Sequence, residues 1–163
     1  MKRLIIVRHA KSVPYGYDDD FHRDLIDRGV YDAEKISTRL KETGITPDLV
    51  IASPATRAIH TATIFCKKLG YDLKTIRQEE DFYEAATTQG FLDVIQQLPE
   101  EVQTVFIFGH NPPISYLVYH LVKSFNGEMP TCSTVGIDFP VVKWSDVASH
   151  DGKVDFQYVP KSM

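Results

Sequence analysis

The chain has 163 residues, of which 43% are hydrophobic and 25% charged, which is enough apolar material for one ordinary domain with a full core. Its formal net charge of −4 disfavours nonspecific nucleic-acid binding, which relies on excess Lys and Arg. No segment approaches the roughly 20 apolar residues that span a bilayer, and the short apolar run at 4–7 ends in Arg-His, unlike a signal peptide. A cytoplasmic protein without a membrane partner is therefore expected.

Short apolar runs alternate with amphipathic helical patterns along the chain, with no internal repeat and no domain linker. This alternation predicts βαβ units and an α/β fold with a mostly parallel, two-sided sheet, in one domain over residues 1–163. Strands are expected at 4–7, 49–52, 73–77, 105–108, 135–139 and 154–159, the last as an antiparallel edge. Helices are expected at 30–43, 54–69, 90–98 and 113–125.

Local signals mark the ends of the first two helices. Ser53 precedes Pro54 and is expected to cap the second helix, because a serine oxygen can accept a hydrogen bond from a free backbone N–H there. Gly44 and Gly70 supply C-terminal stops.

A long loop is expected between Lys11 and Arg28, because Pro14, Gly16 and the three aspartates 18–20 disfavour a regular element. The loop begins two residues after His9, so it should lie at the rim of a site on the first strand. The simplest interpretation of Asp18, Asp19 and Asp20 is a solvated loop. The alternative is a role in repelling anionic competitors or meeting a basic partner.

Cationic and imidazole side chains follow three of the expected strands. Arg8 and His9 follow the strand at 4–7, Arg57 follows the second strand, and His110 follows the strand at 105–108. Because parallel strands place ligands outside their carboxyl ends, these groups can converge on one oxyanion. An arginine fork matches phosphate geometry, and a neutral histidine offers a nucleophilic lone pair. The sequence therefore predicts a metal-free phosphatase that attacks phosphorus with a histidine.

The cysteines and the spacing of candidate ligands give no sign of a metal centre. Cys66 and Cys132 show no CxxC pattern, so buried free thiols are expected. Histidine-rich metal binding at the strand ends is disfavoured, because no carboxylate or cysteine stands at ligand spacing.

Three motifs in order resemble the signatures of the histidine phosphatase superfamily, the phosphoglycerate-mutase-like clan. They are Arg8-His9, then Ser53-Pro54-x-x-Arg57-Ala58-x-x-Thr61, then Gly109-His110-Asn111-Pro112. The short chain, the Arg-His-Ala-Lys-Ser start and Phe82-Tyr83-Glu84-Ala85 are most similar to the phosphohistidine phosphatases of the SixA type.

This resemblance implies a three-layer α/β/α sandwich and no metal or organic cofactor. It implies that His9 is the nucleophile, which attacks phosphorus to give a phosphohistidine intermediate. Arg8 and Arg57 would bind the phosphoryl oxygens. His110 would be the second histidine, which hydrogen-bonds the phosphoryl group in the transition state.

Two positions bear on how far the family pattern extends. The family usually has Arg-Pro-Leu-Thr before the first helix, where this chain has Arg23-Asp24-Leu25-Ile26. Asp27 is then the candidate helix cap in place of the missing threonine, and Arg23 is a candidate phosphate ligand. Glu84 is the best-placed candidate for a general acid, with a solvated loop carboxylate as the alternative.

The leading functional hypothesis is removal of phosphate from phosphohistidine on a small phosphotransfer protein. Without large insertions over the sheet edge, the site should be shallow enough for a protein surface. The alternatives are a small-molecule phosphomonoesterase for a sugar phosphate or nucleotide, with Glu84 as the acid, and a noncatalytic phosphate-binding module. An intact set of two arginines and two histidines argues against the last.

Overall fold

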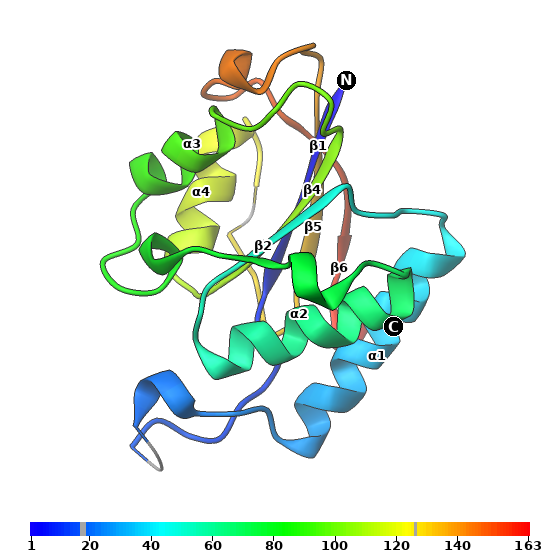
Figure 1. The fold of residues 1–163 in the computed structure, drawn as a ribbon, viewed down its shortest axis with the longest axis vertical. Coiled ribbons are helices and arrows are strands. Elements are labelled where there is room, and N and C mark those ends of the chain that lie inside the picture. The colour runs from blue at the N-terminus through cyan, green and yellow to red at the C-terminus, as the bar shows by residue number, and fades with distance from the viewer. Residues whose placement is uncertain (17–18, 126) are drawn as a thin grey trace.

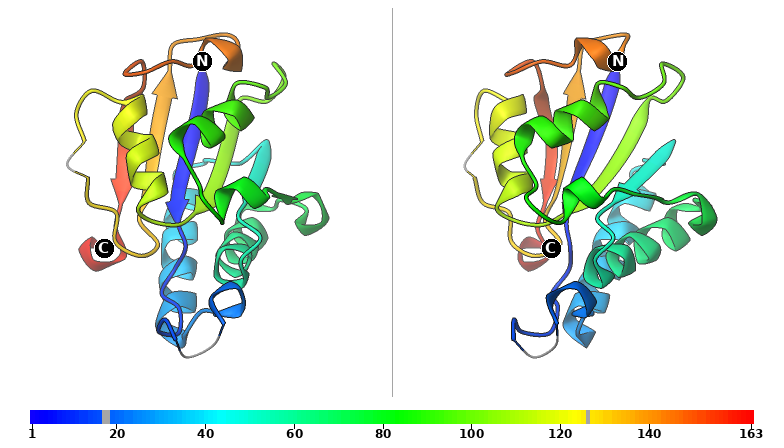
Figure 2. Two further views of the ribbon diagram at one scale, coloured as in Figure 1. Left: turned by 90° about the vertical axis from the view of Figure 1, so that its left-hand side faces the viewer. Right: turned by 60° about the vertical axis from the view of Figure 1, so that its left-hand side comes forward.

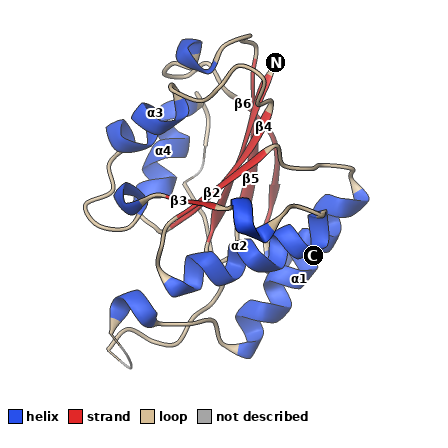
Figure 3. Cartoon of the chain, in the orientation of Figure 1, coloured by secondary structure: helices blue, strands red, loops and turns tan. Residues whose placement is uncertain are grey.

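The computed structural model describes residues 1–16, 19–125 and 127–163, so Tyr17, Asp18 and Asn126 lie outside the described residues. Within that part of the chain, six strands form one sheet in the order β3-β2-β4-β1-β5-β6 (Figure 1). The strands are β1 Lys2–Arg8, β2 Leu49–Ala52, β3 Arg77–Gln78, β4 Thr104–Gly109, β5 Thr134–Phe139 and β6 Lys153–Tyr158. The α-helices are α1 Asp27–Glu42, α2 Thr56–Leu69, α3 Thr88–Ile95 and α4 Pro113–Leu121 (Figure 3).

The sheet is mixed and mostly parallel. Strands β1, β2, β3 and β4 pair in parallel, whereas β5 runs antiparallel to β1, and β6 runs antiparallel to β5 at the edge. Helices α3 and α4 cover one face of the sheet, and α1 and α2 cover the other (Figure 2). The predicted α/β class, the three layers and the antiparallel edge at β6 are confirmed.

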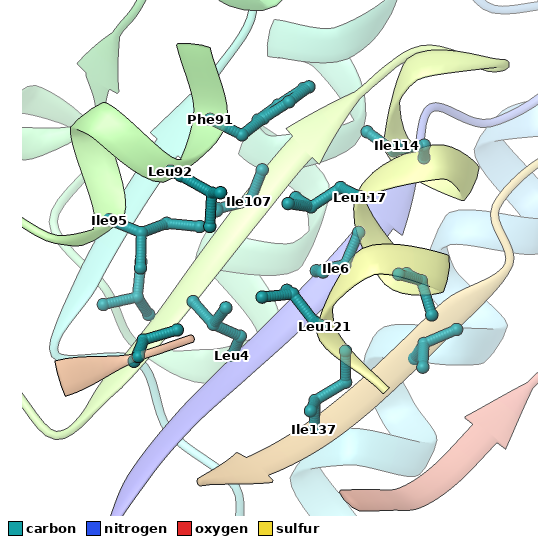
Figure 4. Close-up of a cluster of buried hydrophobic side chains, with 14 of the residues drawn as sticks. Leu4, Ile6, Phe91, Leu92, Ile95, Ile107, Ile114, Leu117, Leu121 and Ile137 are labelled. Carbon is teal, nitrogen blue, oxygen red and sulfur yellow. The ribbon is translucent and has the colours of Figure 1, made fainter. Parts of the chain in front are cut away.

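The alternation of side chains along β1 explains how one short strand supports both layers. Leu4 and Ile6 point to the core beneath α3 and α4 (Figure 4), and Ile5 and Val7 point to the core beneath α1 and α2. All four are fully buried. Since burying such a side chain contributes roughly 1.5–3 kcal/mol, a continuous apolar run is what a strand covered on both faces requires.

Several predicted element boundaries were wrong. The strand expected at 73–77 is mostly a 3₁₀ turn at Leu73–Thr75, because the Asp72 carboxylate accepts a hydrogen bond from the Lys74 N–H at 3.0 Å and turns the chain. The helix expected at 113–125 ends at Leu121, because Val122 is extended and bridges to Gly152.

The third helix begins two residues earlier than expected and ends at Ile95 rather than at residue 98. The Thr87 hydroxyl accepts a hydrogen bond from the Gly90 N–H at 3.0 Å, which caps the first turn. A local polar contact therefore decided this start, which the apolar periodicity alone did not mark.

The two expected N-caps were also wrong. Helix α1 begins at Asp27 itself, with Ile26 as a cap residue that makes no side-chain cap hydrogen bond. Helix α2 begins at Thr56 with Ala55 before it, so Ser53 does not cap it. The C-terminal stops at Gly44 and Gly70 are confirmed, with φ of +79° and +78°.

The predicted free thiols are confirmed, since Cys66 and Cys132 are buried and unbridged. None of the helices in the described ranges has the length and apolar character needed to cross a membrane.

Candidate active site

The sheet aligns the carboxyl ends of β1, β2 and β4 at one edge. Arg8 is paired with Gly109 in the β1–β4 register, and the His9 N–H donates to the Gly109 carbonyl at 3.0 Å. On the other side of β4, the Ser53 N–H donates to the Phe108 carbonyl at 3.0 Å. The backbone therefore fixes the residues after all three strands at the same level.

The two histidines lie side by side. The ring centroids of His9 and His110 are 5.1 Å apart, and the two residues are only 8% and 9% exposed. Residues that are 101 positions apart thus share one buried edge, as the parallel topology predicted.

A backbone carbonyl fixes the tautomer of His9. His9 Nδ1 lies 2.8 Å from the carbonyl oxygen of Ala10, and a carbonyl can only accept a hydrogen bond, so Nδ1–H donates. The neutral ring then carries its lone pair on Nε2. The Ala10 N–H in turn donates to the Thr61 hydroxyl at 3.0 Å, and that hydroxyl donates to the Arg57 carbonyl at 2.8 Å. Thr61 therefore ties the segment that holds His9 to the start of α2.

Ser53 holds the second histidine. His110 Nε2 and Ser53 Oγ are 2.8 Å apart, and Ser53 is fully buried. The same hydroxyl oxygen accepts from the Ala55 N–H at 3.2 Å. Sequence reasoning assigned Ser53 to the helix cap and missed this contact, although its position directly after β2 places it at the same sheet edge as the histidines.

Three buried nitrogens at this edge have no hydrogen-bond partner among the described residues. They are Arg8 Nε, Arg57 Nε and His110 Nδ1. Buried polar groups are nearly always hydrogen-bonded in native structures, so a set of orphaned nitrogens on neighbouring side chains is typical of a site that receives a polar ligand. All three belong to residues that the sequence predicts to bind phosphoryl oxygens.

The remaining guanidinium nitrogens are partly occupied. Arg8 Nη1 donates to the Met129 carbonyl at 3.0 Å. Arg57 Nη1 donates to the Asp20 carbonyl oxygen at 2.6 Å, and Arg57 Nη2 donates to the Asp20 carboxylate at 3.1 Å. These bonds restrain the two forks in the site.

Asp20 is not the solvated loop residue that the sequence favoured. Its carboxylate is 32% exposed and also accepts from Arg23 Nη2 at 2.8 Å and from the Tyr83 hydroxyl at 2.6 Å. Asp18, in the same predicted run, lies outside the described residues, and Asp19 pairs with His22. No sequence pattern distinguishes Asp20 from its neighbours, because the interaction depends on the 3₁₀ turn at Asp20–His22.

Tyr83 and Arg23 reach the site through Asp20. The Tyr83 ring lies 5.6 Å from the His110 ring, and Arg23 also donates to the Val13 carbonyl at 2.7 Å. The candidate phosphate ligand Arg23 is thus placed beside Arg57, with one carboxylate between them. Tyr83 belongs to the Phe82-Tyr83-Glu84-Ala85 motif, but the sequence did not predict its hydrogen bond to Asp20.

Glu84 is exposed and lies next to Tyr83, at the rim rather than in the buried cluster. No hydrogen bond from its side chain to a described residue is found, so the structure does not join Glu84 to the two histidines. Its role as a general acid stays a prediction.

The electrostatics of the cluster keep both rings neutral. Burial, the neighbouring His110 and the two arginines lower the pKa of His9 to about 3. Burial and Arg57 lower the pKa of His110 to about 4, although Asp20 acts in the opposite direction. At neutral pH, His9 therefore has the lone pair that a nucleophile needs.

Asp20 stays ionised over the same range. Burial acts to raise its pKa, but the hydrogen bonds from Tyr83 and the two arginines hold that pKa well below its usual range. Burial and the Asp20 contact together raise the pKa of Tyr83 to about 12, so the phenol remains a donor. In the described ranges, no group of three or more His, Cys, Asp and Glu side chains is arranged to hold a metal ion.

Comparison with known proteins connects this geometry to a family. The profile described as "Histidine phosphatase superfamily (branch 1)" matches residues 4–90. The chain is 40% identical over 76 residues to the serine/threonine-protein phosphatase Pgam5, mitochondrial, of Drosophila grimshawi. That alignment covers 47% of this chain and 26% of the relative, so only about a quarter of that protein is represented.

Solved structures share the fold over nearly the whole chain. The structure of the protein histidine phosphatase SixA complexed with tungstate superposes with a TM-score of 0.84 at 20% identity, covering 98% of each chain. A mycobacterial glucosyl-3-phosphoglycerate phosphatase superposes with a TM-score of 0.68 at 14% identity, covering 95% of this chain and 97% of that one. At these identities, the likeness concerns the fold.

Proposed function

Because the chain belongs to branch 1 of the histidine phosphatase superfamily, we propose that it removes phosphate from phosphohistidine on a protein, with residues 1–163 as one catalytic domain. The observation that carries the proposal is the arrangement around His9. A neutral ring with its lone pair on Nε2 lies beside three orphaned nitrogens on Arg8, Arg57 and His110. A phosphoryl group supplies the oxygens that those nitrogens lack.

The first step is attack of His9 Nε2 on phosphorus. The N–P bond to His9 forms while the bond to the substrate imidazole breaks, and its electron pair leaves with that imidazole. The arginine Nε–H groups and a His110 Nδ1–H then donate to oxygens that gain charge in the transition state. Ser53 supports this tautomer of His110, because its hydroxyl proton is free to donate to Nε2 once its oxygen accepts from Ala55.

The second step is hydrolysis of the phosphoenzyme. Water attacks phosphorus from the side opposite His9, the N–P bond breaks, and the neutral ring is restored as one water proton passes to the departing phosphate. The Ala10 carbonyl holds the ring in the same orientation for both steps. The chemistry therefore needs no group beyond those at the sheet edge.

Support for phosphohistidine as the substrate comes from two sides. One of the nearly full-length fold matches, with a TM-score of 0.84, is to a protein histidine phosphatase. An imidazole can also leave already protonated, so the reaction does not require a buried acid, and Glu84 is at the exposed rim.

A second candidate is a phosphoserine or phosphothreonine ester on a protein. The Pgam5 relatives favour this reaction, since they are named as serine/threonine-protein phosphatases and are 36–41% identical over about half of this chain. An alkoxide leaves poorly without a proton, so this reaction would give Glu84 a role. The small-molecule phosphomonoesterase remains the third reading, as the mycobacterial fold neighbour acts on a small phosphate ester by name.

The experiment offers the enzyme one protein in phosphohistidine form and one in phosphoserine form, with Glu84→Gln beside the wild type. We expect kcat/KM for phosphohistidine to exceed that for the ester by at least about 100-fold, and Glu84→Gln to change the phosphohistidine value less than about threefold. Glu80→Gln, in the adjacent exposed turn, is the matched control. If the wild type prefers the ester, and this preference is lost in Glu84→Gln but kept in Glu80→Gln, phosphoserine rather than phosphohistidine is the favoured substrate.

A further inference from the structure

A polar cavity opens beside the candidate active site and shares Arg8 with it. It has a volume of about 320 Å³ and lies between the loop after β1, the start of α1 and the segments that flank β5 and β6. Its lining includes four cationic residues, Arg8, Lys11, Arg28 and Lys161, and one buried carboxylate, Asp32. No step of the phosphoryl transfer described above uses Lys11, Arg28 or Lys161.

The charge of this cavity is opposite to that of the molecule. The chain carries a net −4, whereas the cavity gathers four cations against one carboxylate. Asp32 is engaged by Arg28 at 2.9 Å. Among the ion pairs of the described residues, none involves Lys11 or Lys161. A concentration of uncompensated positive charge in a concave site attracts an anion.

Arg8 links the cavity to the phosphoryl site. It lines the cavity and directly precedes His9. The lysine ammonium groups, on long flexible stems, are suited to bind a carboxylate or phosphate as point charges without fixed geometry. A ligand held at His9 could therefore extend past Arg8 and place a second anionic group among these lysines.

We propose that this cavity, here called the lysine subsite (Lys11, Arg28 and Lys161), receives a second anionic group of the substrate while the phosphoryl group is at His9. The inference rests on the proposed function, because it assigns the substrate class for the same site. The shared chemistry is a carboxylate or phosphate close to the scissile bond. On a protein substrate the source is an acidic side chain near the phosphohistidine, and on a small substrate it is an acidic group of the same molecule.

The test uses the double variant Lys11→Gln/Lys161→Gln, since both side chains are exposed and their loss spares the Arg28–Asp32 pair. The matched control is Lys143→Gln/Lys153→Gln, two exposed lysines at the opposite edge of the sheet, where β5 ends and β6 begins. Each protein is assayed on three substrate pairs that differ in one acidic group. The pairs are phosphohistidine peptides with Asp or Asn neighbours, N-acetyl phosphohistidine against its amide, and a carboxyphenyl phosphate against phenyl phosphate.

We expect the wild type to favour the acidic member of a pair, and the Lys11/Lys161 variant to lower that preference at least about tenfold through KM. Activity on the neutral member should stay within about twofold, which shows that the fold and the catalytic groups are intact. The control variant should keep the wild-type preference. If the variant loses the preference only in the peptide pair, the ligand of the lysine subsite is an acidic side chain of a protein substrate. If it loses the preference only in the small-molecule pairs, the ligand is a second acidic group of a small substrate.

An unchanged preference in every pair that the wild type hydrolyses would overturn the lysine subsite, whatever the leaving group. Failure of the proposed function looks different. In that case the two phosphohistidine pairs are not hydrolysed, and the phenyl phosphate pair alone reports on the subsite. Raising the salt concentration should reduce the wild-type preference, since the attraction is screened.

Discussion

Asp20 carries a negative charge, like the expected phosphate ligand, and lies among the side chains expected to bind it. Its carboxylate lies against Arg57, Arg23 and Tyr83, so it orients the side chains that face the phosphoryl site. The same carboxylate also neutralises part of the positive charge there. Positioning and charge therefore act in opposite directions on phosphate binding, and a substitution can separate them.

Asp20→Asn removes the charge and keeps the shape. Because a negative group beside the anion is lost, the inhibition constant for inorganic phosphate should fall by about three- to tenfold. An amide has a single acceptor oxygen and cannot accept from all three donors, so kcat should fall as Arg57 loses its restraint. Steady-state kinetics with phosphate as a product inhibitor measure both.

Asp24→Asn is the control for this change, because Asp24 is exposed and contacts His60 rather than the cluster. It should leave both constants within about twofold. Weaker phosphate inhibition in Asp20→Asn would contradict the electrostatic role of Asp20 and leave it a positioning role only.

At the scale of elements, the start of α1 is packed directly against the strand end that holds the nucleophile. A Cβ placed on Gly29 would lie 2.1 Å from the carbonyl oxygen of Lys11, and the same carbonyl accepts from the Ile26 N–H at 3.0 Å. This backbone contact fixes the loop immediately after Arg8 and His9. Glycine is required at position 29 because the Lys11 backbone lies too close for any side chain.

Gly29→Ala should therefore lower the free energy of unfolding by at least about 2 kcal/mol and reduce kcat, because the loop must move away from α1. Urea unfolding and kinetics on the same preparations test this. Gly70→Ala is the comparison, since Gly70 has a positive φ but open space around it. That change should cost about 1 kcal/mol and spare kcat. Equal effects from both would contradict the packing argument.

The elements show where sequence reasoning succeeded and where it did not. The buried runs of β1, β2 and β4 were predicted because a strand covered on both faces is apolar throughout, and that topology brought His9 and His110 together. The helix starts were missed at Asp27 and Thr56, because they depend on tertiary contacts such as the Ser53–His110 bond. Asp20 was missed for the same reason.

For the whole molecule, burying two neutral histidines at one sheet edge makes stability depend on pH. The unfolded chain holds these groups with a pKa near 6.5, whereas in the fold they titrate at about 3 and about 4. Below pH 6.5 the unfolded state therefore binds protons that the folded state does not, so stability falls as the pH falls. The loss ends only near the folded-state values.

Between pH 6.5 and 5, each histidine should remove about 1.5 kcal/mol from the free energy of unfolding. In His110→Gln, the difference in the free energy of unfolding between the two pH values should be smaller by about that amount. Urea unfolding at both pH values measures it. His120→Gln, on α4, is the control substitution for the loss of a histidine outside this cluster. A wild-type pH dependence equal to that of His110→Gln would show that His110 is not buried in its neutral form.

The proposed mechanism transfers the phosphoryl group to His9, which requires the Nε2 lone pair that the Ala10 carbonyl leaves available. The most direct measurement is to quench the enzyme during turnover of a ³²P-labelled phosphohistidine protein in conditions that preserve phosphoramidates, and to map the label. We expect label on His9 in the wild type and no label in His9→Ala, which should fold normally. Label on any other residue, or turnover by His9→Ala at a rate near that of the wild type, would contradict this mechanism.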